Sequence, residues 1–167
     1  EVMTVIESLY TESKTDAVIE YKFYKRENFV DLKVIVEYGD KNKLVRLKIP
    51  APKGLPVGDG PYVVENKPIK REASFHKWCG VKTESDYYAV LNDCVYAGKF
   101  EDGFINITLL RGAGYCIHPI CDRELYPKDR YLKRIENGRY EYEFRIVRGS
   151  LGSIACEAQA FNEKPYA

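Results

Sequence analysis

Apolar and polar residues alternate along the N-terminal third of the chain, with the two-residue period of a β-strand that has one face on a core. The alternation runs through 19–23, through 30–38 and again through 45–49. Short polar turns join these stretches, and sequential alternating strands joined in this way typically pair as antiparallel neighbours. We therefore expect residues 1–50 to form an antiparallel strand meander.

A segment rich in proline and glycine follows, because residues 51–61 hold three of each. This density predicts a surface loop. Apolar residues at Leu151, Ile154, Ala155 and Ala158 have the spacing of a short helix. In the second strand group, within 62–167, strands are expected at 63–64, 75–78, 87–91, 104–110 and 140–146. The pattern predicts a single all-β domain over 1–167, an antiparallel β-sandwich with one short C-terminal helix.

Charge and composition narrow the functional classes. The chain has 26 Lys and Arg against 25 Asp and Glu, a formal net charge of +1. Such a balance gives no electrostatic case for nucleic acid or a membrane surface as a partner. No run of 18 apolar residues is present, as a membrane-spanning helix would need. The five cysteines are an odd number, which favours free thiols in a reducing compartment, so we expect a cytoplasmic protein.

Cysteine and histidine occur together at two places. Cys116, His118 and Cys121 fall within six residues, and His76 lies close to Cys79. The two groups together could supply four zinc ligands, but the spacing is not that of a standard zinc knuckle, and we expect no metal here. The chain also lacks phosphate-binding, dinucleotide, serine-hydrolase and metalloprotease motifs. We therefore expect no catalytic residue in it.

Most carboxylates alternate with apolar residues along the expected strands, and this pattern predicts that they lie on the solvent-exposed face of a sheet. These are Glu20, Asp31, Glu37, Glu141 and Glu143. Asp93 differs, because it follows Asn92 at the end of an apolar run and is expected to turn the chain there.

Arg111 closes the apolar strand 104–110 and precedes a glycine-rich stretch. Its guanidinium could reach into a cleft, or its stem could lie over the sheet as an ordinary surface arginine.

Residues 87–111 resemble the C-terminal part of the α-mannosidases of glycoside hydrolase family 38. Members show an L-N-D, an aromatic–small pair, a D-G turn and a strand that ends in arginine. The matching segments are Leu91-Asn92-Asp93, Tyr96-Ala97, Asp102-Gly103 and 105–111. The resemblance extends to 21–50, to His76-Lys77-Trp78 in place of a Q-R-W, to 141–147 and to 158–162.

The resemblance implies a β-sandwich of the kind seen in sugar mutarotases, packed against a catalytic domain of the same chain. The nucleophile and the zinc site of the family lie in that domain, so this stretch would be an excised piece of a longer enzyme and would carry no cofactor itself. The expected substrates are mannosides or mannose-containing oligosaccharides, hydrolysed with retention. The resemblance places Arg111, Asn92 and Asp93 at the rim of the sugar site.

The chain departs from the family pattern at three places, Cys79-Gly80, Ala97 and 147–150. Two other interpretations stay open. One is a free-standing carbohydrate-binding module that uses exposed tyrosines and Trp78 as stacking platforms. The other is a small zinc-stabilised β domain built on Cys116, His118 and Cys121.

Overall fold

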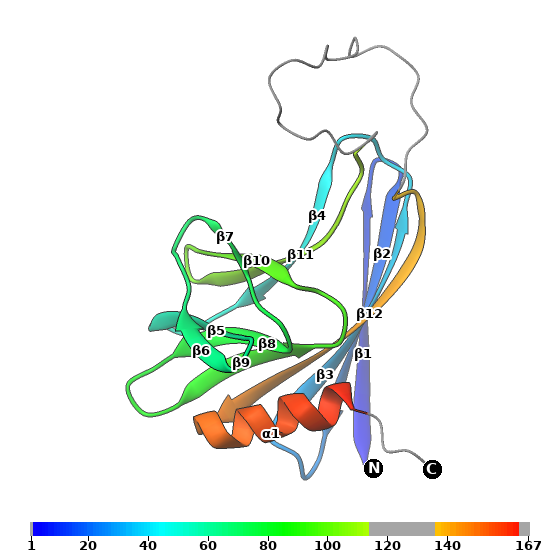
Figure 1. The fold of residues 1–167 in the computed structure, drawn as a ribbon. Helices are drawn as coiled ribbons and strands as arrows, with labels where there is room; N and C mark the ends of the chain where they lie inside the picture. The colour runs from blue at the N-terminus through cyan, green and yellow to red at the C-terminus, as the bar shows by residue number, and fades with distance from the viewer. Residues whose placement is uncertain (1, 114–135, 164–167) are drawn as a thin grey trace, which may run out of the picture.

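The computed structural model, described for residues 2–113 and 136–163, has two antiparallel sheets and one C-terminal helix (Figure 1). This confirms the expected all-β sandwich. The strands are β1 (Met3–Glu12), β2 (Thr15–Tyr24), β3 (Phe29–Tyr38), β4 (Leu44–Pro50), β5 (Leu55–Gly60), β6 (Val63–Asn66), β7 (Glu72–Ser74), β8 (Trp78–Lys82), β9 (Tyr87–Asn92), β10 (Ala97–Glu101), β11 (Phe104–Arg111) and β12 (Gly138–Gly149), and the helix is α1 (Leu151–Asn162).

The two sheets differ in width. The large sheet has eight strands in the order β1-β2-β3-β12-β9-β8-β5-β6, and the small sheet has four in the order β4-β11-β10-β7. Strand β12 lies between β3 and β9, so it joins the first strands of the chain to the middle ones. The long strands β1, β2, β3 and β12 lie on the right of Figure 1, and β9, β8, β5 and β6 on the left.

The main core fills the space between the sheets. One side of β3 contributes Leu32, Val34 and Val36, each at most 3% exposed, while the intervening residues are half-buried or exposed. This alternation of buried and less buried side chains explains why the sequence pattern predicted the strand. The facing residues of the small sheet include Leu47, Ile49, Ile105, Ile107 and Phe100.

Helix α1 covers the outer face of the large sheet, below β9 and β12 in Figure 1. Ser150 caps its N-terminus by accepting a hydrogen bond from the Ser153 amide at 3.2 Å. Ile154 and Ala158 are its buried residues, and they pack with Trp78 in a second core cluster. The expected short C-terminal helix is therefore confirmed, although Ala155, one of the four residues that predicted it, is exposed.

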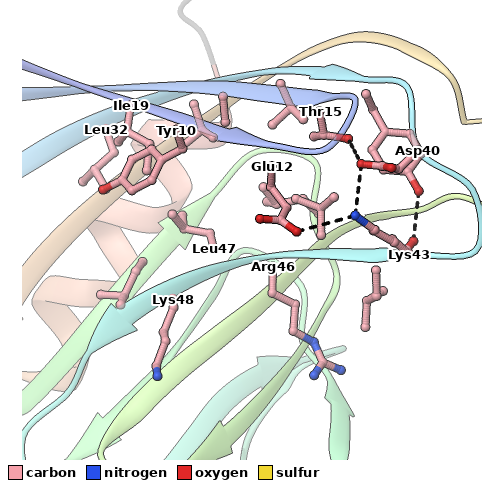
Figure 2. A pocket seen from close by; sticks show the side chains of 18 of the residues that line it. Tyr10, Glu12, Thr15, Ile19, Leu32, Asp40, Lys43, Arg46, Leu47 and Lys48 are labelled. Carbon is pink, nitrogen blue, oxygen red and sulfur yellow. Dashed lines mark hydrogen bonds and ion pairs between the residues drawn. The ribbon is translucent and has the colours of Figure 1, made fainter.

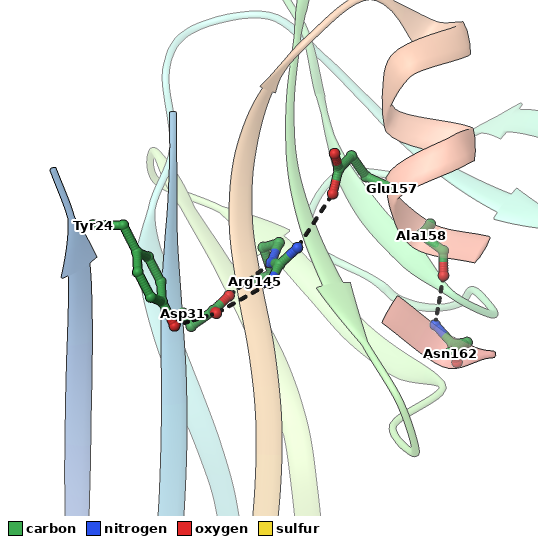
Figure 3. Close-up of polar contacts among 6 residues, drawn as sticks. All are labelled: Tyr24, Asp31, Arg145, Glu157, Ala158 and Asn162. Carbon is green, nitrogen blue, oxygen red and sulfur yellow. Dashed lines mark hydrogen bonds and ion pairs between the residues drawn. The ribbon is translucent and has the colours of Figure 1, made fainter. Parts of the chain in front are cut away.

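A polar network ties this helix to the sheet (Figure 3). The Arg145 guanidinium donates to both carboxylate oxygens of Asp31, at 2.7 and 3.1 Å, and to Glu157 of α1 at 3.2 Å. Tyr24 donates to the same Asp31 carboxylate at 2.9 Å, and the Arg145 guanidinium carbon lies 3.7 Å from the Phe29 ring centre. The expectation of a solvated carboxylate was therefore wrong for Asp31, because Arg145 from the neighbouring strand β12 pairs with it.

Two further expectations were wrong. The meander is broken after β3, because β4 joins the small sheet and pairs with β11 while β12 takes the place beside β3. Residues 51–61 are not a loop throughout, since β5 pairs with both β6 and β8. Pro56 is tolerated there because it lies just before the part of β5 that pairs with β6: its carbonyl accepts from the Lys67 amide at 2.8 Å, and no residue of the β5–β6 ladder lies opposite to need its missing N–H.

Strand limits also shifted in the middle of the chain. Residues 75–77 of the expected strand at 75–78 are instead the connection between β7 and β8, since β8 begins at Trp78, and β1, β7 and β10 were not foreseen. No helix of the described residues is both long enough and apolar enough to cross a membrane.

Candidate functional site

Arg111 is exposed at the last position of β11, where it pairs with Leu44 of β4. No described side chain forms a hydrogen bond or an ion pair with its guanidinium. A β-bulge between Thr108 and Leu110 shifts the register just before it, so Leu110 is buried and Arg111 faces solvent. Among residues 2–113 and 136–163, no side chain occupies the five donors of the guanidinium.

Asn92 ends β9 and is 1% exposed. Its amide nitrogen donates to the carbonyl of His76 at 3.1 Å, and its amide oxygen accepts from the backbone N–H of Val95 at 2.8 Å. Its own backbone bonds Lys77 at 2.9 Å and the Asn162 side chain at 3.0 Å. Both ends of the Asn92 side chain are therefore used to hold the adjoining turns, and the turn that was expected from Asp93 is made by Asn92.

Asp59 supports the same region from the other side, and nothing in the sequence pattern singled it out. One carboxylate oxygen accepts from the backbone N–H groups of His76 and Trp78, at 3.0 and 3.1 Å, and the other accepts from Lys77 at 3.0 Å. The segment between β7 and β8 is therefore clamped by one carboxylate and one buried amide. The only sequence signal was a lone acid between Gly58 and Gly60, which is equally typical of a loop.

Asp93 is exposed and directly precedes Cys94. Cys94 is exposed, and partial desolvation of its thiol, followed by the hydrogen bond to Asp93 and the charges of Asp93 and Glu143, raises the thiol pKa to about 12. The thiol stays protonated near neutral pH and is a poor nucleophile there. Asp93 and Arg111 do not share a strand pair, since β9 ends beside β12 whereas β11 ends beside β4.

A groove opens between the sheets beside β4 (Figure 2). Its volume is about 560 Å³, and its walls come from β1, β2, β3 and β4. Ile19, Leu32 and Leu47 form part of the apolar lining, and Tyr10 stands on the β1 wall, 52% exposed. The groove exists because the large sheet extends beyond the edge of the narrower one.

Charged residues close one end of this groove. Asp40, 6% exposed, accepts from the Thr15 hydroxyl at 2.8 Å and lies 3.4 Å from the Lys43 ammonium, which also reaches Glu12 at 3.7 Å. Desolvation raises the pKa of Asp40, but hydrogen bonds from Thr15, Ser13 and the Lys14 amide, with the Lys43 charge, outweigh it and hold the pKa below 3.8. The ionised carboxylate thus joins the β1–β2 turn to the start of β4.

We expect Asp40→Asn to lower the free energy of unfolding at neutral pH, because the amide loses the charge that these donors stabilise. A carboxylate whose folded pKa is depressed stabilises the fold above its unfolded pKa and loses that contribution as the pH falls through the folded value. The difference in the free energy of unfolding between wild type and variant should therefore be full above the ordinary pKa of an aspartate and shrink as the pH falls through the lower folded value. Urea unfolding between neutral pH and pH 3 measures this, and a difference that is constant with pH contradicts it.

Aromatic stacking platforms are the signature of a free-standing carbohydrate-binding module. Trp78 cannot serve as one, because it is 2% exposed beneath helix α1. The expectation that Trp78 is exposed was wrong. Trp78 begins β8, and helix α1, which is far away in sequence, covers it. Three exposed tyrosines lie in separate parts of the chain: Tyr10 on β1, Tyr62 in the turn between β5 and β6, and Tyr96 in the connection between β9 and β10.

Metal ligation is expected to be absent, and this stays a prediction. Cys116, His118 and Cys121 lie outside the described residues. His76 is exposed, whereas Cys79 is fully buried in the core and burial strongly raises the pKa of its thiol. Within 2–113 and 136–163, no three His, Cys, Asp or Glu side chains are grouped as metal ligands would be.

Comparison with known proteins gives a likeness in fold alone. No family model matches the sequence, and no curated protein matches it. A glycosyl hydrolase family 38 protein from Enterococcus faecalis superposes with a TM-score of 0.67 at 17% identity, covering 88% of this chain and 18% of that chain. An alpha-mannosidase from Enterococcus faecalis V583 gives 0.66 at 16% identity, covering 88% and 17%. The chain therefore has the fold of a β-sandwich segment that makes up less than a fifth of these glycoside hydrolase family 38 structures.

Proposed function

We propose that this chain is the non-catalytic β-sandwich part of an α-mannosidase that hydrolyses α-mannosidic linkages with retention. It supports a catalytic domain of the same polypeptide, and that domain holds the nucleophile and the zinc. The observation that carries the proposal is the fold likeness over 88% of the chain, together with the family-like motifs in their order.

In this proposal Arg111 lends its guanidinium to the rim of the sugar site. Its exposure at a strand end, with no described partner, supports that role. Asp93 is the exposed carboxylate of the L-N-D segment and is the second rim candidate. Asn92 belongs to the same segment and fixes its shape, because its side chain bonds the backbone on both sides.

A binding measurement on the isolated chain tests this role. A rim arginine contributes one or two hydrogen bonds of about 1.5–3 kcal/mol each. The total is about 1.5–6 kcal/mol, and the cost of association, about 4 kcal/mol or more, leaves less than the roughly 4 kcal/mol that a 1 mM Kd requires. We therefore expect calorimetric titration with methyl α-mannoside, or with a mannose disaccharide, to give no Kd below about 1 mM.

Micromolar binding to the isolated chain would contradict this and favour a free-standing module. In that case the exposed Tyr62 and Tyr96 are the first residues to replace by alanine, since Trp78 is buried. Loss of binding in either variant would identify the platform.

A further inference from the structure

Strand β4 has a free edge beside an apolar floor. It is the terminal strand of the small sheet, and no described strand pairs with the side that faces away from β11. The large sheet continues beyond this edge through β3, β2 and β1. Exposed strand edges are templates for a further strand, and apolar floors are rarely left uncovered.

The floor beneath this edge is mainly apolar. The inner faces of β1, β2 and β3 present Tyr10, Ala17, Ile19, Tyr21 and Leu32 to the groove. In Figure 2, Leu47 of β4 points into this space toward β1 and β2, whereas Arg46 and Lys48 point the opposite way. A strand added to β4 would therefore place every second side chain over the apolar floor and the others beside Arg46 and Lys48.

The charges on β4 indicate which side chains an added strand should place beside Arg46 and Lys48. Residues 41–50 hold Lys41, Lys43, Arg46 and Lys48 and no carboxylate. Arg46 is paired with Glu72, while Lys48 lies over the Phe104 ring with its ammonium 4.0 Å from the ring centre. Opposite charges directly across from each other stabilise a strand pair and like charges destabilise it. The edge thus favours a neighbour with carboxylates on its outer face.

We propose that the free edge of β4 binds an extended polypeptide segment in which apolar residues alternate with Asp or Glu. The segment adds to the small sheet as a fifth strand, its apolar side chains fill the groove, and its carboxylates lie beside Arg46 and Lys48. This inference concerns a peptide-binding surface and does not depend on the proposed mannosidase role.

The test uses two capped synthetic peptides of seven residues, the length of β4, in which Val alternates with Glu or with Lys. Binding to the 167-residue chain is followed by fluorescence anisotropy, with each labelled peptide alone as the reference. Amide hydrogen exchange then locates the contact. We expect the Glu peptide to bind more tightly and to slow exchange in 44–50 by about tenfold or more, with exchange unchanged in β1 and β6, the two edge strands of the large sheet.

A charge reversal gives the specificity. Lys48→Glu should lower the affinity for the Glu peptide by about 3- to 10-fold, because a cross-strand ion pair becomes a repulsion. It should raise the affinity for the Lys peptide by a similar factor, because a repulsion becomes an ion pair. Lys53→Glu is the matched control, since Lys53 is exposed and lies beyond the end of β4, and it should change neither affinity by more than about twofold.

Three results would overturn the proposal. One is unchanged exchange in 44–50 at saturating peptide. Another is protection confined to β1 or β6, which would place the peptide on the large sheet. The third is a dimer in sedimentation experiments that already protects β4 without peptide, which would mean that a second copy occupies the groove.

Discussion

Replacing Arg111 by alanine in the whole protein should lower kcat/KM for an aryl α-mannoside by about tenfold to a few hundredfold or more. The variant removes one or two charge-assisted hydrogen bonds, each worth roughly 1.5–3 kcal/mol, and 1.4 kcal/mol corresponds to a factor of ten. Arg111→Lys should recover part of the rate, because an ammonium cannot reproduce the planar donor fork. The loss should not change with pH, since arginine keeps its charge throughout the working range.

Stability of the isolated chain is the control for this variant. Arg111 is exposed and has no described side-chain partner, so Arg111→Ala should leave the free energy of unfolding within about 0.5 kcal/mol of wild type. Kinetics within twofold of wild type would make Arg111 an ordinary surface arginine. Unfolding of the isolated chain would make it a structural residue.

Asp59→Ala should destabilise the chain by about 4 kcal/mol. The carboxylate accepts from three backbone N–H groups in the segment between β7 and β8. Hydrogen bonds to a charged group contribute about 1.5–3 kcal/mol each, and their sum is reduced because water can reach part of this segment. Urea unfolding measures the change, and a drop in Tm of roughly 10 °C should accompany it in a domain of this size.

Asp59→Asn is the matched variant. It keeps one carbonyl oxygen but turns an NH₂ group toward donors, so about half of the loss should remain. Asp16→Ala, at an exposed position of β2, should change the free energy of unfolding by no more than about 0.5 kcal/mol. Equal effects of Asp59→Ala and Asp16→Ala would show that the Asp59 clamp carries no net stability.

The sequence pattern predicted strands wherever one face lies on the core. Strands β2, β3, β11 and β12 alternate because each presents one side to the space between the sheets. Strand β1 was missed because it is an edge strand exposed on both faces, with apolar residues such as Val5, Ile6 and Leu9 on either side. Strand β10 was missed because it begins with Ala97 and Gly98, which have low strand propensity.

Strand partners could not be read from local pattern. Both β4 and β12 alternate clearly, but only long-range packing decides that β12 lies beside β3 and that β4 crosses to the other sheet. A Cβ at Gly98 would lie 2.9 Å from the Asn106 carbonyl and 3.2 Å from the Phe75 ring, so the glycine serves close packing that only the folded chain reveals.

Some features of the candidate site could be predicted from the sequence, and others depend on the folded chain. The position of Arg111 at a strand end could be anticipated, but its exposure depends on the β-bulge between Thr108 and Leu110, because plain alternation from Ile105 and Ile107 would turn residue 111 toward the core. The burial of Asn92 and the triple acceptance by Asp59 depend on segments that meet only in the fold. The groove beside β4 depends on the unequal widths of two sheets, which no single segment encodes.

The most direct measurement compares hydrolysis of 4-nitrophenyl α-mannoside by the 167-residue chain and by the whole protein that contains it, each with and without zinc. We predict turnover by the whole protein and none above the buffer rate by the isolated chain. Turnover by the isolated chain that a point substitution within it abolishes would contradict the non-catalytic assignment. A folded whole protein with no α-mannosidase activity in the presence of zinc would contradict the proposed enzyme.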